Sequence, residues 1–187
     1  MSRPRTMRLD ARAMKILAHP LRSRLLGALR LGGPASASTL AQALGTNSGA
    51  TSYHLRRLAE TGLVVDEPGG RGRERLWRAA SEGHSWSPSD AAGDPDGEAA
   101  NDWLEADSLR VLEERAGSWQ DAKHRWPPRW RDAAGGGDWF VDLPPDRLRA
   151  LLDDLAAVID GYRDAPPAPD ARRVLLFVHA FPQGDPP

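Results

Sequence analysis

The side chains of this chain that could take part in catalysis are few and far apart. Its 187 residues include no cysteine, which excludes disulfides, thiolate metal ligands and cysteine nucleophiles. The sequence contains neither a phosphate-binding P-loop nor a G-x-S-x-G motif. Asp153 and Asp154 are neighbours on a predicted helix, where adjacent side chains point about 100° apart, which does not suit an acid–base pair. We therefore expect that the protein is not an enzyme.

The histidines do not form a recognisable metal site either. They stand at positions 19, 54, 84, 124 and 179. Asp121 and His124 form an i, i+3 pair on a predicted helix, but a single such pair is more often a surface pair than a metal site. His179 lies in a strand-like run and is interpreted as structural. We expect no metal and no cofactor.

One stretch concentrates small and hydrogen-bonding side chains, 46-TNSGATSYHLRRLAETGLVV-65. It predicts a helix that starts near Ser48 and is stopped by Gly62. The helical period places Thr51, Leu55 and Leu58 on one inward face. The opposite side has small residues at its N-terminal end and hydrogen-bond donors after them. His54 lies at the edge of the inward face, and we assign it no role.

A helix of this kind suits the major groove of DNA. Small side chains allow close approach, while serine, tyrosine and arginine donate hydrogen bonds to base edges and phosphates. The first turn also offers unpaired N–H groups to a phosphate. The predicted DNA contacts in this stretch are Thr46, Asn47, Ser48, Gly49, Ser52, Tyr53, Arg56 and Arg57.

The neighbouring elements must position that helix. Further helices are predicted over 11–19, 21–31 and 39–45, and two strands over 63–67 and 73–79. Asp10 is a candidate N-cap for the first helix, Pro20 can open the second, and Gly45 ends the third, which follows Ser36 or Ser38.

The two strands form a hairpin, because the turn PGGRG between them contains glycines that permit positive φ. A helix-turn-helix followed by a basic hairpin is a winged helix. The hairpin adds three predicted contacts at or near its tip, Arg71, Arg73 and Arg75, which suit the DNA backbone or the minor groove.

The charge is divided unevenly along the chain. Residues 1–80 hold 14 Lys/Arg against 5 Asp/Glu, whereas residues 81–187 hold 11 against 21. A basic first part indicates that this part meets a polyanion such as DNA. The plainer alternative is a solvated charged face.

The rest of the chain is predicted to be an extension of the winged helix. Residues 81–97 lack periodicity and are expected to be a linker or loop. A long helix starts near Asp96, strands are expected over 139–143 and 173–181, and a second helix over 146–164. The expected organisation is a DNA-binding domain over 1–80, the linker over 81–97, and a dimerisation and possible effector domain over 98–187. The fold class is mostly α with a small β component (α+β).

The long helix bears a broad apolar stripe and is the best candidate for a dimer contact. The predicted dimerisation residues are Trp103, Leu104, Leu109, Leu112, Ala116 and Trp119. All seven tryptophans lie at position 77 or beyond. They either fill a core and a dimer interface or line a cleft for an apolar effector.

Three segments together resemble the winged-helix domain of the ArsR-like family of bacterial transcriptional regulators, over about residues 10–80. They are LAHPLRSRLLGAL, TLAQALGTNSGATSYHLRRLAETGLVV and GRGRERLWR. The resemblance implies a homodimer on a palindromic operator, with two recognition helices about one DNA turn apart, and repression as the family tendency. It assigns base or phosphate contacts to Ser48, Gly49, Ser52, Tyr53 and Arg56.

Two further expectations concern partners and location. The alternative function is a winged-helix module for protein–protein interaction, whose basic face binds an acidic regulatory partner. No apolar run approaches the ~18 residues of a membrane span, and the start MSRPRTMRLDARAM has no apolar core of a signal peptide. We therefore expect a cytoplasmic protein.

Overall fold

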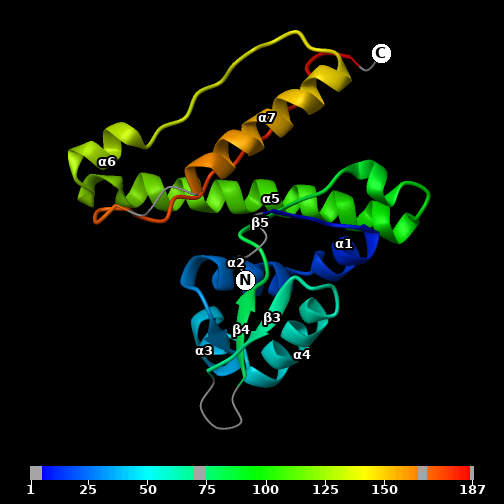
Figure 1. Ribbon diagram of the computed structural model, residues 1–187, viewed down its shortest axis with the longest axis vertical. Helices are drawn as coiled ribbons and strands as arrows, with labels where there is room; N and C mark the ends of the chain where they lie inside the picture. Colours follow the sequence, from blue (N-terminus) through cyan, green and yellow to red (C-terminus); the bar gives the residue numbers. More distant parts are fainter. Residues whose placement is uncertain (1–5, 70–74, 164–167, 186–187) are drawn as a thin grey trace. The chain divides into compact units, whose positions relative to one another are not determined.

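The computed structural model describes residues 6–69, 75–163 and 168–185. The chain divides into two compact units, Met1–Arg110 and Val111–Pro187. The first unit holds the helices α1 Ala11–Leu17, α2 Pro20–Gly32, α3 Ala37–Leu44 and α4 Ser48–Ala59, the 3₁₀ helix η1 Pro88–Ala91, and the first part of α5 Pro95–Ala122. In the first unit, α3, α4 and the hairpin described below lie at one end (Figure 1).

The helix boundaries follow local capping signals. Asp10 accepts a hydrogen bond from the N–H of Ala13 at 2.8 Å and starts α1. Pro20 occupies the first turn of α2, where a missing N–H costs nothing. Ser36 rather than Ser38 caps α3, and Gly45 ends it at a φ of 65°, a left-handed conformation that favours glycine.

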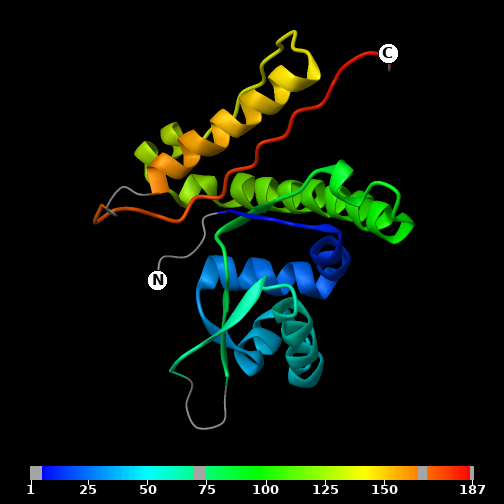
Figure 2. The same cartoon turned by 45° about the vertical axis from the view of Figure 1, so that its right-hand side comes forward.

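The described residues of the first unit also form short strands: β1 Thr6–Arg8, β2 Ala35–Ser36, β3 Val64–Glu67, β4 Leu76–Ala79 and β5 Gly83–Ser85. In the antiparallel sheet β4 lies between β2 and β3, and Val64 is opposite Ala79 while Glu67 is opposite Leu76. The hairpin β3–β4 is the predicted wing, and the ends of its strands near Glu67 and Leu76 lie at the same end of the unit as α4 (Figure 2). A second, parallel pair joins β1 to β5.

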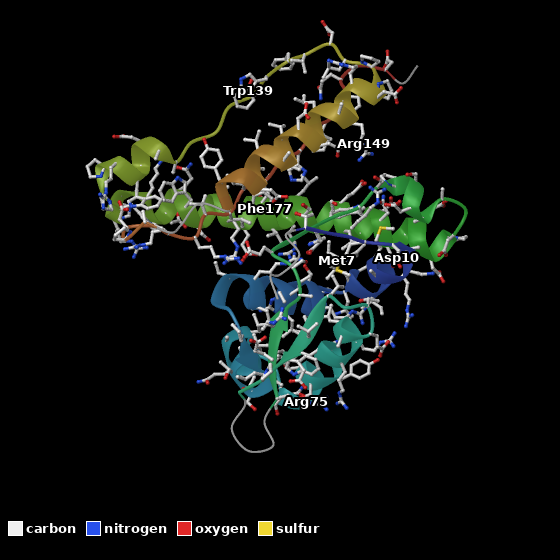
Figure 3. All side chains as sticks on the ribbon, viewed as in Figure 1. Met7, Asp10, Arg75, Trp139, Arg149 and Phe177 are labelled. Carbon is white, nitrogen blue, oxygen red and sulfur yellow. The ribbon has the colours of Figure 1, made fainter. Side chains whose placement is uncertain are left out.

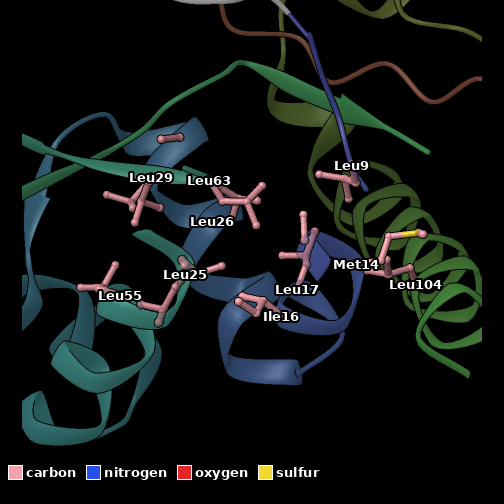
Figure 4. Packing of buried hydrophobic residues seen from close by; sticks show 14 of the residues in the cluster. Leu9, Met14, Ile16, Leu17, Leu25, Leu26, Leu29, Leu55, Leu63 and Leu104 are labelled. Atoms are coloured by element: carbon pink, nitrogen blue, oxygen red, sulfur yellow. The ribbon is translucent and has the colours of Figure 1, made fainter. Parts of the chain in front are cut away.

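The core of the first unit is built mainly from leucines (Figure 4). Helix α2 contributes Leu25, Leu26 and Leu29, and α4 contributes Leu55 and Leu58. Each fully buried leucine stabilises the fold by about 1.5–3 kcal/mol relative to exposure. These contacts fix the orientation of α4, because its inward face is completely buried in the core.

The prediction of a linker over 81–97 is wrong in the structure. This segment contains β5, η1 and the first turn of α5. Ser81, Ser87 and Ala91 are buried, and Trp86 packs against the core. A strand of three residues and a single 3₁₀ turn are too short to show a period, so the polar composition was misleading.

The second unit holds the end of α5, the 3₁₀ helix η2 Lys123–Arg125, α6 Pro128–Ala133 and α7 Pro145–Arg163. The expected strands over 139–143 and 173–181 do not form, and both segments lack regular secondary structure. Their apolar, β-branched composition favours strands, but neither finds a partner strand in the described part of this unit. The fold class, mostly α with a small β component, is confirmed.

No described residue beyond Arg110 is buried. Large apolar side chains remain open, with Trp139 and Phe140 each more than four-fifths exposed. Among the helices that the structure describes, none is both long and apolar enough to cross a membrane.

Candidate nucleic-acid interface

Helix α4 is held at its N-terminus by a side-chain cap and along its length by the core. The side-chain oxygen of Asn47 accepts a hydrogen bond from the N–H of Ala50 at 2.7 Å. Thr51 is fully buried, and its hydroxyl donates to the carbonyl of Asn47 at 3.0 Å. The threonine is therefore satisfied inside the protein, and the opposite face of the helix is the one available to a ligand.

The available face carries the predicted small residues and donors. Ser48, Gly49 and Arg56 are exposed, Ser52 is half-buried, and the ring of Tyr53 is 54% exposed. A Cβ added to Gly49 would meet only the side-chain oxygen of Asn47, at 3.4 Å. The fold therefore does not require glycine there, whereas a closely approaching ligand would.

The two arginines of α4 differ in their engagement. Arg56 donates from Nε to the carbonyl of Ser52 at 3.1 Å, which leans the side chain along the helix surface. Arg57 donates to the carboxylate of Glu60 at 2.6 Å, with both side chains 40% exposed. A phosphate would have to compete with Glu60 for Arg57 but not for Arg56.

The wing lies at the same end of the unit as α4, and Arg75 lies there too (Figure 3). Its Nε is 3.4 Å from a carboxylate oxygen of Asp66 across the hairpin, and both side chains are more than half exposed. The next cross-strand ion pair joins Arg78 to Glu67. Arg71 and Arg73 lie outside the described residues.

The turn before α4 has a mainly structural role. Thr46 is half-buried, and its N–H donates to the carbonyl of Ala41 at 2.9 Å. Asn47 is the N-cap. Both were predicted as DNA contacts. The side chain of Asn47 is engaged as the helix cap although the residue is exposed, whereas the hydrogen bond of Thr46 uses its backbone N–H.

Residues 17–67 match the model of a protein family described as "Helix-turn-helix domain". A solved structure described as a possible transcriptional regulator for arsenical resistance is 30% identical, over 57% of this chain and 96% of that one (TM-score 0.34). The chain belongs to the ArsR-like family of winged helix-turn-helix regulators.

A second solved structure is the homodimeric winged helix-turn-helix DNA-binding domain of a possible ArsR-family regulator from Mycobacterium bovis. It is 26% identical and covers 56% of this chain and 78% of that one, with a TM-score of 0.35. A third, from Mycobacterium tuberculosis, is 18% identical over 87% of this chain and 86% of that one, with a TM-score of 0.33. No curated protein matches the chain.

In this ArsR-like chain, sequence reasoning missed a group of side chains beside α4. The ring of His54, to which no role was assigned, contacts the ring of His19, with centroids 4.5 Å apart and the planes tilted by 40°. His19 is itself the N-cap of α2, because its Nδ1 accepts a hydrogen bond from the N–H of Leu21 at 3.1 Å. The position of His19 directly before Pro20 is a capping signal that could have been recognised in the sequence. Its contact with His54 could not have been recognised, because the two residues are far apart along the chain.

The predicted dimerisation residues of the ArsR-like chain divide into two groups. Leu104 is only 4% exposed and belongs to the core of the first unit, so a partner subunit cannot contact it. The prediction that Leu104 is a dimerisation residue is wrong. Trp103 is half-buried and packs against the same core. The remaining four residues are exposed or half-buried along the later turns of α5: Leu109, Leu112, Ala116 and Trp119.

Proposed function

We propose that this ArsR-like protein is a cytoplasmic repressor that binds a palindromic operator as a homodimer, through α4 and the wing. The supporting observation is the outward face of α4. This face combines Gly49, which the packing of the fold does not require, with the exposed Tyr53 and Arg56. The inward face of the same helix is fully buried. This combination allows close approach to a groove and supplies donors to bases and phosphates.

The homodimer is proposed to form along α5. Leu109, Leu112, Ala116 and Trp119 recur every three or four residues and so lie on one side of that helix. The Mycobacterium bovis domain is described as homodimeric, which supports two copies here as well. Two recognition helices then read two half-sites about 34 Å apart.

Modulation by a small apolar effector is also part of the proposal. The rings of Trp119, Trp126 and Trp130 form a chain in the second unit, with successive centroids 5.9 and 5.8 Å apart. Quenching of tryptophan fluorescence by candidate aromatic compounds, with a Trp126→Leu variant as control, would identify an effector that binds there.

The experiment that tests DNA binding is a gel shift with the DNA upstream of the gene itself, at several salt concentrations. Specific retention with a steep salt dependence is expected, because phosphate contacts release counterions. Arg56→Ala should weaken binding roughly tenfold, as expected for loss of a charge-assisted contact. If no fragment is specifically retained and the protein instead captures an acidic protein partner, the protein-interaction function replaces this one.

A further inference from the structure

Four basic side chains meet where the first turn of α2 packs on α4, and we call them the junction cluster: His19, Arg22, His54 and Arg57. The imidazole rings of His19 and His54 are 4.5 Å apart and tilted by 40°. The charge of Arg22 acts on both rings, and that of Arg57 acts on Arg22. The cluster joins the recognition helix to the helix that precedes the helix-turn-helix.

The junction cluster contains unusual unpaired atoms. In the described part of the chain, three buried side-chain nitrogen or oxygen atoms lack a hydrogen-bond partner within the protein, and two of them are Nε of Arg22 and Nδ1 of His54. Buried polar groups are nearly always paired, so each exception calls for an explanation such as a strained or ligand-binding site. Two exceptions in one place point to a partner from outside the chain.

Among the described residues, only Arg57 of the cluster has a carboxylate partner. Arg57 is paired with Glu60, but no carboxylate of the described residues pairs with Arg22. Burial, followed by the charge of Arg22, lowers the pKa of His19. Burial, followed by His19 and Arg22, lowers the pKa of His54. Burial and Arg57 likewise lower the pKa of Arg22. In the protein without a ligand, the charged forms of His19, His54 and Arg22 are therefore disfavoured. A bound anion would stabilise these charged forms.

The cluster lies beside the outward face of α4, which favours an anion that belongs to a ligand of that face. His54 directly follows Tyr53, whose exposed ring meets it edge-on at 5.1 Å between centroids. His19, Arg22 and His54 are each half-buried rather than enclosed, so each is partly accessible to a ligand at the surface. A duplex docked on the outward face of α4 brings its backbone next to this point.

We propose that the junction cluster binds one phosphodiester group of the DNA backbone, with Arg22 as the principal contact and the two histidines as proton-sensitive partners. This rests on the proposed function. The planar guanidinium of arginine matches two phosphate oxygens at once. Such a contact fixes the position of the protein on the duplex and adds affinity without reading sequence.

A phosphate bound at the junction cluster makes the affinity for DNA depend on pH. Above pH 6.5 the histidines of the free protein are neutral, because their pKa values lie below that ordinary value. A phosphate beside them favours the charged rings, so DNA binding takes up protons and the affinity rises as the solution is acidified. The groups that face the rings are Arg22 from α2 and Tyr53 from α4, with Arg57 and its partner Glu60 behind Arg22.

The decisive variant is Arg22→Gln, compared with Arg12→Gln on the exposed surface of α1. Fluorescence anisotropy with the upstream operator and with an unrelated duplex, at several salt concentrations, should show a loss of about tenfold on both DNAs. The slope of log affinity against log salt should fall by about one. Arg12→Gln should change neither quantity appreciably. An unchanged slope for Arg22→Gln would overturn the proposal.

Thermal unfolding without DNA separates this role from a structural one. Removing an unpaired, half-buried charge should leave the Tm unchanged or raise it. A clearly lowered Tm for Arg22→Gln would mean that the residue supports the fold and that weaker DNA binding is secondary. His54→Gln should flatten the rise in affinity between pH 7.5 and 5.5, and a wild-type affinity that falls on acidification would contradict the proposed contact.

Free phosphate is the competing occupant. If inorganic phosphate raises the Tm of the wild type at constant ionic strength while Arg22→Gln keeps the full salt slope on DNA, the cluster takes free phosphate and the proposal is wrong. Failure of the proposed function looks different, because the wild type itself would then show no specific operator complex.

Discussion

At the scale of single residues, the structure distinguishes side chains that build the fold from those it leaves open to a ligand. Leu55 and Leu58 are completely buried in α4, and Thr51 is buried with its hydroxyl satisfied. Gly49 and Tyr53, on the same helix, are exposed and are not needed for packing. The useful residue-scale experiments are therefore those in which stability and binding change independently.

Gly49→Ala is such an experiment. Alanine in a helix is about 0.5–1 kcal/mol more stable than glycine, and the added methyl group meets only one side-chain atom, at 3.4 Å. We expect denaturant unfolding to show equal or greater stability, while operator affinity falls because the methyl group stands between helix and groove. Equal operator affinity for Gly49→Ala and the wild type would show that Gly49 does not closely approach the DNA.

His84 provides a residue-scale prediction about pH. Burial, with the charge of Arg30 second, lowers its pKa to about 3, and its Nδ1 accepts a hydrogen bond from Arg30. The unfolded chain binds a proton near pH 6.5 and the folded chain does not, so this stability is complete above 6.5 and is lost as the pH falls towards 3. At pH 5 the loss is up to about 2 kcal/mol.

Denaturant titrations between pH 7.5 and 5 measure this loss. His84→Asn can keep an acceptor near Arg30 but cannot take up a proton, so its stability should depend less on pH over that range. A wild-type stability that is flat from pH 7.5 to 5 would show that His84 is accessible to protons in the folded protein.

At the scale of elements, α5 serves two purposes along its length. Its first turns place Ala100 and Leu104 in the core of the first unit, and Asp107 accepts a hydrogen bond from Ser23 of α2 at 2.6 Å. Its later turns bear apolar side chains that are exposed or only half-buried, such as Leu109 and Leu112. The boundary between the compact units therefore falls inside a continuous helix, at Arg110.

Leu104→Ala and Leu109→Ala test this division. Leu104→Ala should lower the free energy of unfolding by about 2–4 kcal/mol, because it removes buried methyl groups and leaves a cavity. Leu109 is 43% exposed, so its alanine variant should change stability by less than about 0.5 kcal/mol. Chemical denaturation of both variants measures the difference, and similar costs would contradict the placement of Leu104 in the core.

The helices and strands also differ in how far each could be predicted from the sequence. Helices α1 to α4 and the wing were predictable, because Asp10, Pro20 and Gly45 are local signals that act within a few residues. Strands β1 and β5 were not, because three-residue strands show no period and Thr6 pairs with Gly83, far along the chain. The segments 139–143 and 173–181 were overpredicted because their composition favours strands, while the described residues of the second unit offer them no partner strand. Similarly, the candidate site was predictable on α4 but not at the His19–His54 contact.

At the scale of the whole molecule, the first unit has the core and the candidate DNA surface, and the second exposes apolar side chains. A chain that ends at Arg110 keeps the part of α5 on which the first core depends. We expect it to remain folded but to be monomeric, and to bind the operator more weakly because two linked half-sites no longer act together. Light scattering after size-exclusion chromatography measures the mass, and a dimer of the shortened chain would place the interface within the first unit.

The parallel pairing of β1 with β5 determines when the first unit can be completed during synthesis. Thr6–Arg8 are synthesised before the helix-turn-helix and the wing, yet their partner Gly83–Ser85 is made only after both. The ion pairs from Arg8 to Asp90 and from Lys15 to Asp94 span similar separations. Contacts so distant in sequence close late, because the loop entropy is lost before they form. Strand β1 therefore lacks its partner strand in the nascent chain while α2, α3 and α4 can already assemble.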